Sequence, residues 1–360
     1  MPIKWNKWEW SEFYAFLKIL SDRKLPAADS NLSVMPWKFF IFHKIIREEQ
    51  QGKKKFYDIE WTPLGQVRIL DNNKDLLYIF DDVDLPLKTQ KIFESIKNAG
   101  KWTFYIEEAR KLMDELSCTK IKASWARKED IVWIIDDRIS QISAELGFSI
   151  KSMIGGSSTL LNAWDTTNFV FKIEWLRWNK EEINRIGGRK KIRDRVSKIK
   201  EMWWKLVFVK PKNTIFSGNL RKIDTVFWKV IANMLLDFYS GNGSKISDLT
   251  KKLSESTTLW DFWFSENDYE YKVKNFLDAV ALWMVPWKEW DGVSIAQWGY
   301  IIVKEDGEVI CYHLYNRDEF RSYLFENTKF ETASSNKHWF ATIYEDWGEL
   351  FFNLNLQVRF

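Results

Sequence analysis

The sequence has few of the residues that build disulfide networks, zinc sites and histidine-based catalytic centres. It contains two cysteines, Cys118 and Cys311, and three histidines, His43, His313 and His338, all far apart in the chain. The cysteines are too few for a disulfide framework or a tetrahedral zinc site, so both are expected to pack as small apolar groups in a reducing compartment. The histidine spacing disfavours paired-histidine zinc signatures and a Ser-His-Asp triad.

Long apolar runs are also missing. The amino terminus, MPIKWNKWEW, has no run of signal-peptide length, and the run AVALWMVPW from Ala279 is about half of the roughly 20 residues that span a bilayer. We therefore expect a cytoplasmic protein with no membrane partner. A content of 46% hydrophobic and 29% charged residues is ordinary for a globular chain and allows one large domain or two smaller ones.

The net charge is small but the basic residues are clustered. A formal charge of +4 does not by itself indicate a polyanionic partner. The segment Gly187–Lys200, GGRKKIRDRVSKIK, has seven basic residues and one acid, and Gly52–Lys55 is a second cluster. Such runs neutralise DNA phosphates in some proteins and form the solvated face of a helix in others, and the sequence leaves both interpretations open.

Glycine is scarce and tryptophan abundant, with 15 and 22 residues respectively. Tight turns favour glycine because positive φ angles strain residues that have a Cβ. Tryptophan nevertheless stands in turn-like contexts such as LNAWDTT and YEDWGELFF. We hypothesise that many tryptophans correspond to UGA codons that the source cell reads as glycine. The alternative is a genuine stacking surface for sugars or bases. Trp10 and Trp290 lie outside glycine-like contexts and are expected to be genuine.

Hydrophobic periodicity predicts an α/β chain. An amphipathic helix is expected from about Glu9, and two β-rich segments, Lys128–Asp136 and Glu145–Ser152, are close enough in sequence to form a hairpin. A single long basic helix is expected over residues 179–202. A boundary is placed near residue 205, between a core region (1–205) and a carboxyl-terminal helical and β-rich region (206–360) that also holds the strands of YIIVKEDGEVICYHLY.

The proposed hairpin brings an acid and a lysine together. Alternation places Ser149 and Lys151 on one face of the second strand, with Phe148 and Ile150 toward the core, while Asp130 opens the first strand. A carboxylate beside a lysine suits Mg²⁺-dependent phosphodiester hydrolysis, because the metal activates a water and the lysine stabilises negative charge. From spacing alone the simpler interpretation is favoured, in which the aspartate caps a turn and the lysine extends from a sheet edge.

Longer segments resemble a known family. The run KEDIVWIIDD…ELGFSIKS resembles the PD-(D/E)XK nuclease core, and the whole chain is similar to the HpaII family of type II restriction endonucleases. The segments that carry this resemblance are NKWEWSEFYAFLKILSDRKLPAADSNL, GFSIKSMIGGSSTLLNAWDTTNF, YHLYNRDEFRSYLFENTKFETASS and LNLQVRF. It implies a restriction-endonuclease-like mixed sheet flanked by helices, with Asp130 as a metal ligand and Lys151 as the catalytic lysine. Glycine at Trp8 and Trp164 would bring the chain closer to the family pattern.

The sequence departs from the family pattern at Ser149, which stands where the second acid is expected. Glu145 shares the strand face but lies about 20 Å from the catalytic lysine in an extended strand, too far to share a metal. Asp165 resembles the swapped acid of certain relatives. Glu12, or Glu9, corresponds to the acid that this fold often presents from its first helix, and Glu12 is preferred as the second metal ligand, with an exposed helix residue as the alternative.

DNA contacts are expected from the polar side chains after the catalytic strand, from the basic segment Gly187–Lys200 and from the carboxyl-terminal region. Hydroxyl and amide groups directly after the catalytic strand suit the DNA backbone, although they also suit a turn or a helix cap. The candidates are Ser157, Ser158, Thr159, Asn162, Arg189, Lys190, Lys191, Arg193, Asn327, Lys337 and Arg359.

The resemblance implies a Mg²⁺-dependent, type II site-specific deoxyribonuclease that cuts double-stranded DNA within CCGG. A palindromic target favours two-fold symmetry and a homodimer on DNA. The family also implies a cognate DNA methyltransferase in the same restriction-modification system, without a stable complex between the two. The alternatives are a non-catalytic nucleic-acid-binding protein, whose lost acid at Ser149 is not replaced, and a carbohydrate binder whose tryptophans are genuine.

Overall fold

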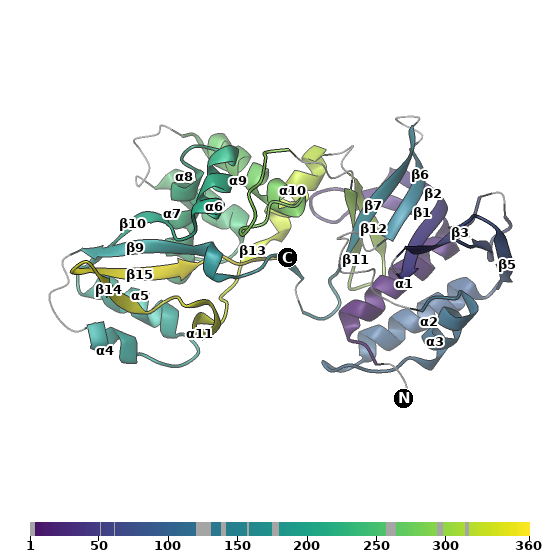
Figure 1. Cartoon of the computed structure of the whole chain (residues 1–360), viewed down its shortest axis with the longest axis horizontal. Helices are drawn as coiled ribbons and strands as arrows, with labels where there is room; N and C mark the ends of the chain where they lie inside the picture. The colour runs from purple at the N-terminus through teal and green to yellow at the C-terminus, as the bar shows by residue number, and fades with distance from the viewer. Residues whose placement is uncertain are drawn as a thin grey trace. The chain divides into compact units, whose positions relative to one another are not determined.

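The computed structural model of the chain describes residues 4–50, 52–60, 62–119, 131–137, 142–156, 158–174, 180–256, 264–293, 298–313 and 317–360. Two compact units are formed (Figure 1): unit 1 is Met1–Ser158 with Gln297–Phe320, and unit 2 is Thr159–Ala296 with Arg321–Phe360. This division lies at residue 158, whereas the predicted boundary lies near residue 205. Both units combine β-sheet with helices, which confirms the expected α/β class at this coarse level.

Unit 1 is built on a mixed sheet of nine strands among the described residues. Their order is β1-β12-β11-β7-β6-β2-β3-β4-β5, and β1 also pairs with β2. The six strands from β1 to β2 therefore close on themselves, while β3, β4 and β5 extend outward from β2. The strands are β1 (Lys24–Ala28), β2 (Val34–Gln50), β3 (Lys53–Asp58), β4 (Gln66–Leu70), β5 (Leu76–Asp81), β6 (Ile131–Asp137), β7 (Ile142–Ser152), β11 (Trp298–Val303) and β12 (Val309–His313).

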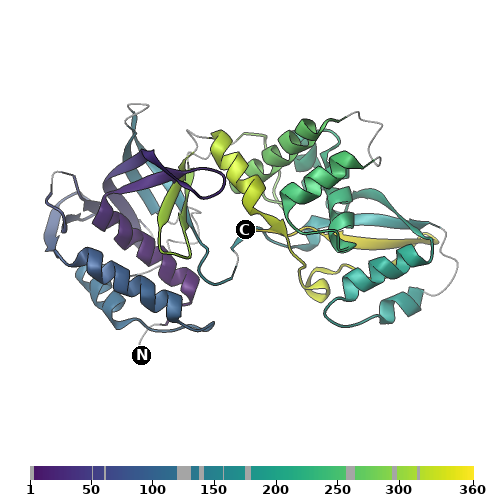
Figure 2. The same cartoon turned by 180° about the vertical axis from the view of Figure 1, so that it is seen from behind.

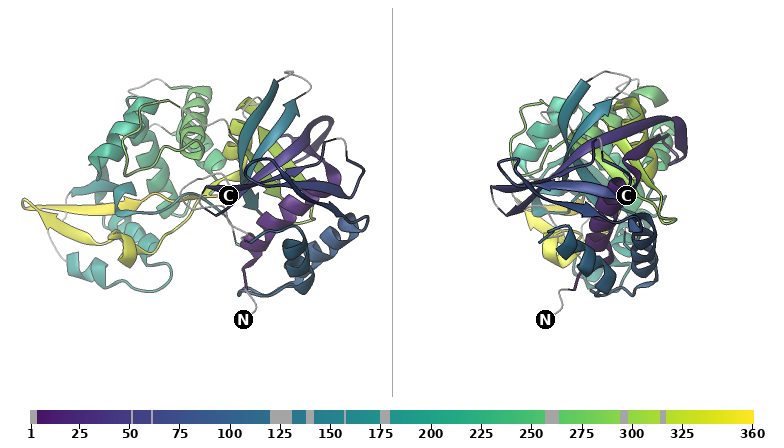
Figure 3. Two further views of the ribbon diagram at one scale, coloured as in Figure 1. Left: turned by 45° about the vertical axis from the view of Figure 1, so that its right-hand side comes forward. Right: turned by 90° about the vertical axis from the view of Figure 1, so that its right-hand side faces the viewer.

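The helices described before residue 158 in unit 1 are α1 (Lys7–Asp22), α2 (Leu85–Asn98) and α3 (Glu107–Glu115), and unit 1 also includes the start of α10 (Arg317–Asn327). The first confirms the helix expected from about Glu9. It begins at a capping box in which the Asn6 side chain accepts from the Glu9 amide at 2.9 Å and the Glu9 carboxylate accepts from the Asn6 amide at 3.0 Å. Helix α1 lies beside α2 (Figure 3), and because α1 also packs against β7, its apolar side chains form part of the core.

The predicted hairpin is confirmed in its backbone. Strands β6 and β7 are antiparallel, with Ile131 opposite Phe148 and Asp137 opposite Ile142. On its other side β7 pairs in parallel with β11, a strand from the carboxyl-terminal half of the chain. The prediction that the strands of residues 298–313 belong to the carboxyl-terminal β-rich region is therefore wrong. Strand β11 pairs with β7, and β12 pairs with β1.

Unit 2 contains a four-stranded antiparallel sheet in the order β10-β9-β15-β14 and a small sheet in the order β13-β16-β8. Helices α6 and α7 pack on β10, and α7 also contacts β15 (Figure 2). The elements are β8 (Thr159–Leu161), η1 (Asp165–Thr167), β9 (Asn168–Glu174), α4 (Lys180–Arg185), α5 (Lys191–Glu201), β10 (Lys205–Pro211), α6 (Thr214–Ile223), α7 (Phe227–Tyr239), α8 (Ile246–Glu255), α9 (Glu266–Ala281), α10 (Arg317–Asn327), β13 (Lys329–Phe330), α11 (Ser335–His338), β14 (Ile343–Asp346), β15 (Glu349–Asn355) and β16 (Val358–Arg359).

The single basic helix predicted over residues 179–202 is wrong. The described residues of this segment form two helices, α4 and α5, separated by a loop that contains Gly187 and Gly188. Gly188 has a φ of +95°, a left-handed conformation that glycine adopts without steric cost in the loop between the two helices. The basic residues that follow therefore belong to a loop and to the first turns of a new helix.

The two cysteines behave as expected. Cys118 and Cys311 are free thiols with exposed fractions of 2% and 0%. Burial raises the pKa of the Cys118 thiol to about 11 and that of Cys311 well above its usual value, so both thiols stay protonated at neutral pH. Their role is packing. None of the helices in the described ranges is long and apolar enough to cross a membrane.

Candidate active site

Strand β7 presents its two faces to different surroundings. Phe148 and Ile150 are fully buried in the core cluster that contains α1, which confirms the predicted core-facing side. Ser149 and Lys151 alternate with them and are only half-buried. The Lys151 Nζ atom lies 5.5 Å from the centroid of the Tyr300 ring on the adjacent strand β11. The lysine thus stands on the side of the sheet that is not filled by α1, and it is partly accessible.

A pair of serines attaches α1 to the end of β7. The Ser152 hydroxyl donates to the Ser11 Oγ atom at 2.9 Å, and the Ser11 hydroxyl donates to the Lys7 carbonyl at 2.8 Å. Ser152 also accepts from the Ile154 amide at 3.0 Å. Because both serines are buried, these bonds hold the first helix at the carboxyl end of β7. Their neighbours in the chain are Glu12 on the helix and Lys151 on the strand.

Glu12 is buried, with an exposed fraction of 2%. The alternative in which Glu12 is an exposed helix residue is therefore wrong. A carboxylate at this depth requires a cation or hydrogen-bond donors, because desolvation of an unpaired charge costs several kcal/mol. Its burial suits an acid that binds a cation. Glu9, the other acid considered on this helix, uses its carboxylate in the helix cap.

The remaining acids differ in what the structure describes. Asp130 lies outside the described residues; Ile131, the residue after it, begins β6 and pairs with Phe148. The backbone of Glu145 lies in β7 opposite Ile134, and its side chain is outside the described set. Within the described residues, no group of three or more His, Cys, Asp or Glu side chains is arranged to hold a metal ion.

Asp165 has a local partner in unit 2. Its carboxylate accepts from the Lys212 ammonium at 2.6 Å and from the Asn168 side-chain amide at 3.0 Å, at the start of η1. Both members of the ion pair are about half exposed. Asp165 therefore neutralises Lys212 and supports the turn before β9. Asp165 belongs to unit 2, whereas Lys151 belongs to unit 1.

The predicted DNA-contacting hydroxyl groups are only partly described. Ser157 lies outside the described residues, Ser158 and Thr159 are half-buried, and Asn162 is exposed. Thr159 begins β8, so this segment continues into a strand and does not cap a helix.

The carboxyl-terminal candidates are placed separately. Lys337 is exposed on α11, and the Asn327 amide donates to the Tyr323 carbonyl at 3.0 Å. Arg359 forms an ion pair with Glu331 at 2.5 Å. Arg359 and Asn327 thus have structural partners, which leaves Lys337 as the exposed cation among the three.

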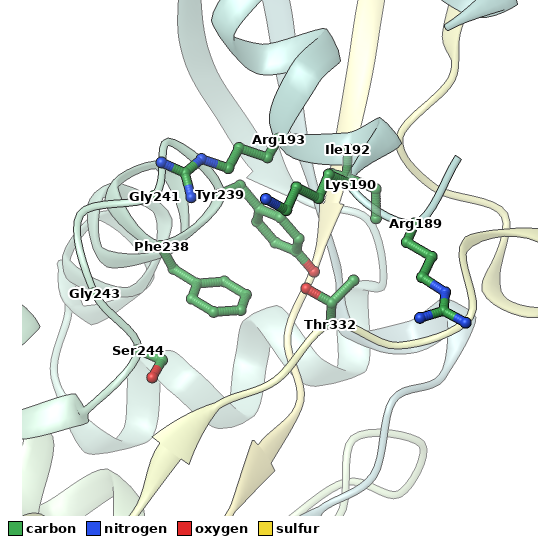
Figure 4. Close-up of a pocket in the computed structure, with 10 residues that line it drawn as sticks. All are labelled: Arg189, Lys190, Ile192, Arg193, Phe238, Tyr239, Gly241, Gly243, Ser244 and Thr332. Atoms are coloured by element: carbon green, nitrogen blue, oxygen red, sulfur yellow. The ribbon is translucent and has the colours of Figure 1, made fainter. Parts of the chain in front are cut away.

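The basic cluster is gathered around one pocket of unit 2. Arg189, Lys190 and Arg193 line a cavity of about 340 Å³ (Figure 4). Lys191 is directed elsewhere, because its Nζ atom donates to the Asn336 side chain at 3.1 Å. The sequence indicated the cations but missed the residues opposite them, since these come from distant segments with no recognisable motif. The other lining residues are Ile192, Phe238, Tyr239, Gly241, Gly243, Ser244 and Thr332.

Comparison with known proteins identifies the class of this chain. A family model described as HpaII restriction endonuclease matches residues 6–360. The type II restriction enzyme HpaII of Haemophilus parainfluenzae is 38% identical over 370 residues, which covers 99% of this chain and 98% of that enzyme. No solved structure matches the chain. The protein is thus a restriction endonuclease, an enzyme that cleaves DNA at a specific site.

Within that class, the chain belongs to the HpaII restriction endonuclease family, as the resemblance implied. Family membership also sets aside the alternatives of a non-catalytic binder of nucleic acid and a binder of carbohydrate.

Proposed function

We propose that this chain is a Mg²⁺-dependent enzyme that hydrolyses double-stranded DNA within CCGG, and that its β6–β7 hairpin belongs to a PD-(D/E)XK core. The observation that carries the proposal is the similarity to the restriction enzyme HpaII along the whole chain. The antiparallel hairpin and the half-buried Lys151 on its second strand support the proposal.

The donor set proposed for Mg²⁺ consists of Asp130 and Glu12. Carboxylate oxygens are the protein ligands that Mg²⁺ prefers. Glu12 is proposed because its carboxyl group is buried and because Ser11 and Ser152 hold its helix at the carboxyl end of β7, although Lys151 projects from the other face of that strand. Asp130 is proposed from its position directly before Ile131, which pairs with the strand that carries Lys151. Ser149 is not proposed as a ligand, since a neutral hydroxyl binds this metal poorly.

Lys151 is proposed to act on the scissile phosphate. Its ammonium group would stabilise the negative charge that develops on the phosphate and orient the attacking water. When bound, Mg²⁺ would polarise the phosphate and lower the pKa of a coordinated water. The Tyr300 ring below the lysine limits its rotamers and orients it by a cation–π contact.

The proposal includes the enzyme's setting. A palindromic target is read most simply by two copies related by a two-fold axis, so we propose a homodimer on DNA. A cognate methyltransferase would protect the same sites in host DNA without forming a stable complex. Since restriction and protection both act on intracellular DNA, the proposed location is the cytoplasm.

Digestion of a plasmid of known sequence tests this function. Purified protein with Mg²⁺ is expected to produce discrete fragments whose sequenced ends all lie within CCGG. Chelation by EDTA is expected to stop the reaction. Fragment ends at a different fixed sequence would refute the CCGG specificity while retaining the restriction activity, and undiminished cleavage in EDTA would refute the metal dependence.

A further inference from the structure

The pocket in unit 2 is lined by three basic residues and by no acidic one. Arg189 and Lys190 precede α5, Arg193 lies in its first turn, and no acidic residue is among those that line the cavity. In Figure 4 the Arg189 guanidinium points away from Lys190 and Arg193, so these two residues are the cations that an anion in the pocket would meet. Lys198 lies on the same helix but outside the pocket, and its Nζ atom is 4.0 Å from the Glu201 Oε2 atom.

A glycine makes room for one of these cations. Gly241 follows the end of α7 with a φ of +87°, and a Cβ atom at this position would collide with the Arg193 guanidinium. The guanidinium therefore packs directly over the glycine backbone, as the sticks in Figure 4 show. This close approach restricts the rotamers of Arg193 and lowers the entropy lost when it binds a ligand.

The rest of the pocket adds aromatic and hydroxyl groups. Phe238 and Tyr239 lie at the end of α7, with ring centroids 4.7 Å apart, and Ser244 and Thr332 contribute hydroxyls. The Tyr239 phenol donates to the Asn355 carbonyl at 3.0 Å, and burial raises its pKa well above the usual value, so it remains neutral. The pocket thus offers cationic donors together with an apolar surface.

We propose that this pocket binds a backbone phosphate of the DNA substrate, with the adjoining sugar against Phe238. The proposal rests on the DNA-cleaving activity of the chain. Guanidinium groups bind phosphate oxygens in a bidentate manner, and a contact to the backbone positions the duplex without reading its sequence. The cavity of about 340 Å³ has room for more than the phosphate group alone.

The salt dependence of DNA binding tests this site. Arg193→Ala and Lys190→Ala, each in a Lys151→Ala background that slows cleavage, are expected to lower affinity for a CCGG duplex. Each is also expected to reduce the slope of log affinity against log salt by about 1. The same loss is expected on a duplex without CCGG, because a phosphate contact carries no sequence information. The matched control, Lys198→Ala, should leave the slope unchanged.

The outcomes separate this proposal from the proposed function. The two pocket substitutions are also made with Lys151 intact. If they leave DNA affinity and the salt slope unchanged and the enzyme still cleaves CCGG normally, the proposal that the pocket binds a phosphate is overturned and the proposed function stands. A loss confined to the CCGG duplex would also overturn the pocket proposal and indicate base readout. Absence of cleavage by the unmodified protein on any duplex would instead refute the function. Thermal melting of each variant verifies the fold.

An independent observation concerns four tryptophans. Trp203, Trp283, Trp339 and Trp347 have φ angles of 61°, 93°, 53° and 49°. For a residue with a Cβ, the left-handed region costs about 1–2 kcal/mol. Their exposed fractions are 88%, 41%, 77% and 97%, so burial of the indole contributes little in return. Trp10, which was expected to be genuine, is fully buried and donates to the Phe104 carbonyl at 3.1 Å.

Three of these tryptophans occupy the position after a helix where glycine is preferred. The helix ends are closed by bonds from Trp204 N to Ile199 O (3.2 Å), from Met284 N to Ala279 O (2.8 Å) and from Phe340 N to Ser335 O (3.3 Å), each spanning the left-handed residue. Helix α7 ends in the same way, with Asn242 N bound to Asp237 O at 3.0 Å, but its left-handed residue is Gly241.

The fourth tryptophan lies in a hairpin. Trp347 and Gly348 form the two-residue turn between β14 and β15, where Asp346 pairs with Glu349. Both turn residues have positive φ, the arrangement that favours glycine or asparagine at each position. Trp164, by contrast, has a φ of −142°, and its backbone does not require glycine.

We infer that Trp203, Trp283, Trp339 and Trp347 are glycine in the protein made by its source cell, at codons that this cell reads as glycine. Peptide sequencing of the native protein is expected to show glycine at all four positions and tryptophan at Trp10. Tryptophan at the four positions in native peptides would overturn the inference.

Stability of the recombinant chain gives a second measurement. Trp203→Gly and Trp347→Gly are each expected to raise the melting midpoint by roughly 1–3 °C, because the backbone strain is relieved. The matched control Trp10→Gly is expected to lower the midpoint sharply. A lower midpoint in the first two variants would contradict the inference.

Discussion

Replacement of Lys151 by alanine is expected to slow DNA cleavage at least 100-fold, by about 10²–10³, while DNA binding is largely kept. The ammonium group is proposed to act on charge that develops at the scissile phosphate, so its loss affects the reaction more than the affinity. Removal of one electrostatic donor of this kind slows catalysis by about 10²–10³. The measurement is the single-turnover rate of plasmid cleavage, with duplex affinity measured in parallel. Glu12→Gln is expected to slow cleavage and raise the Mg²⁺ concentration needed.

A lysine elsewhere in the fold provides the control for this experiment. Lys172 lies on β9 and forms a partly exposed ion pair with Glu349 at 2.5 Å. Since such pairs contribute about 0–1 kcal/mol, Lys172→Ala is expected to fold and cleave normally. Cleavage by Lys151→Ala at the rate of the unmodified enzyme would remove the catalytic role from this lysine and from the hairpin.

Substitution of Glu49 by alanine is expected to destabilise the fold by about 3–5 kcal/mol, since it removes one member of a buried ion pair with Arg47. Arg47 and Glu49 are both nearly inaccessible, and Arg47 Nε lies 3.1 Å from Glu49 Oε1. The other carboxylate oxygen accepts from the Thr119 amide and hydroxyl at 2.6 and 2.8 Å. Urea unfolding measures the loss.

The same carboxylate makes stability depend on pH. Burial by itself raises the pKa of Glu49, but the attraction of Arg47 and the hydrogen bonds from Thr119 outweigh it, so the pKa in the folded state is lowered. A carboxyl group whose pKa is lower in the folded state stabilises the fold. This contribution is complete at pH values above its pKa in the unfolded chain, and it is lost as the pH falls through its pKa in the folded chain. Glu49→Ala should therefore unfold with a weaker acid dependence than the unmodified chain.

The exposed acid Glu345 serves as the control for the stability measurements. It pairs with Lys180 at 2.8 Å on the surface of unit 2, and its replacement by alanine is expected to leave the unfolding midpoint nearly unchanged. If Glu345→Ala and Glu49→Ala lower the free energy of unfolding equally, burial does not determine how much stability is lost when an acid is removed.

Local patterns in the sequence were sufficient for several parts of this protein. The α1 helix follows from its apolar spacing and its acidic start, and the β6–β7 hairpin follows from two alternating segments close in sequence. Lys151, Arg189 and Lys190 were singled out as candidates because a charge inside an apolar strand or a cluster of like charges is visible without coordinates, but the catalytic role of Lys151 came from the family resemblance.

Other properties depend on segments that meet only in the folded chain. The pairing of β11 with β7 joins residues that are far apart in sequence, and no local pattern specifies it. The burial of Glu12 is decided by the packing of α1 on β7, and the pocket around Arg193 requires the end of α7 and Thr332. Sequence periodicity reports which face of an element is apolar, but only tertiary packing decides which element covers that face.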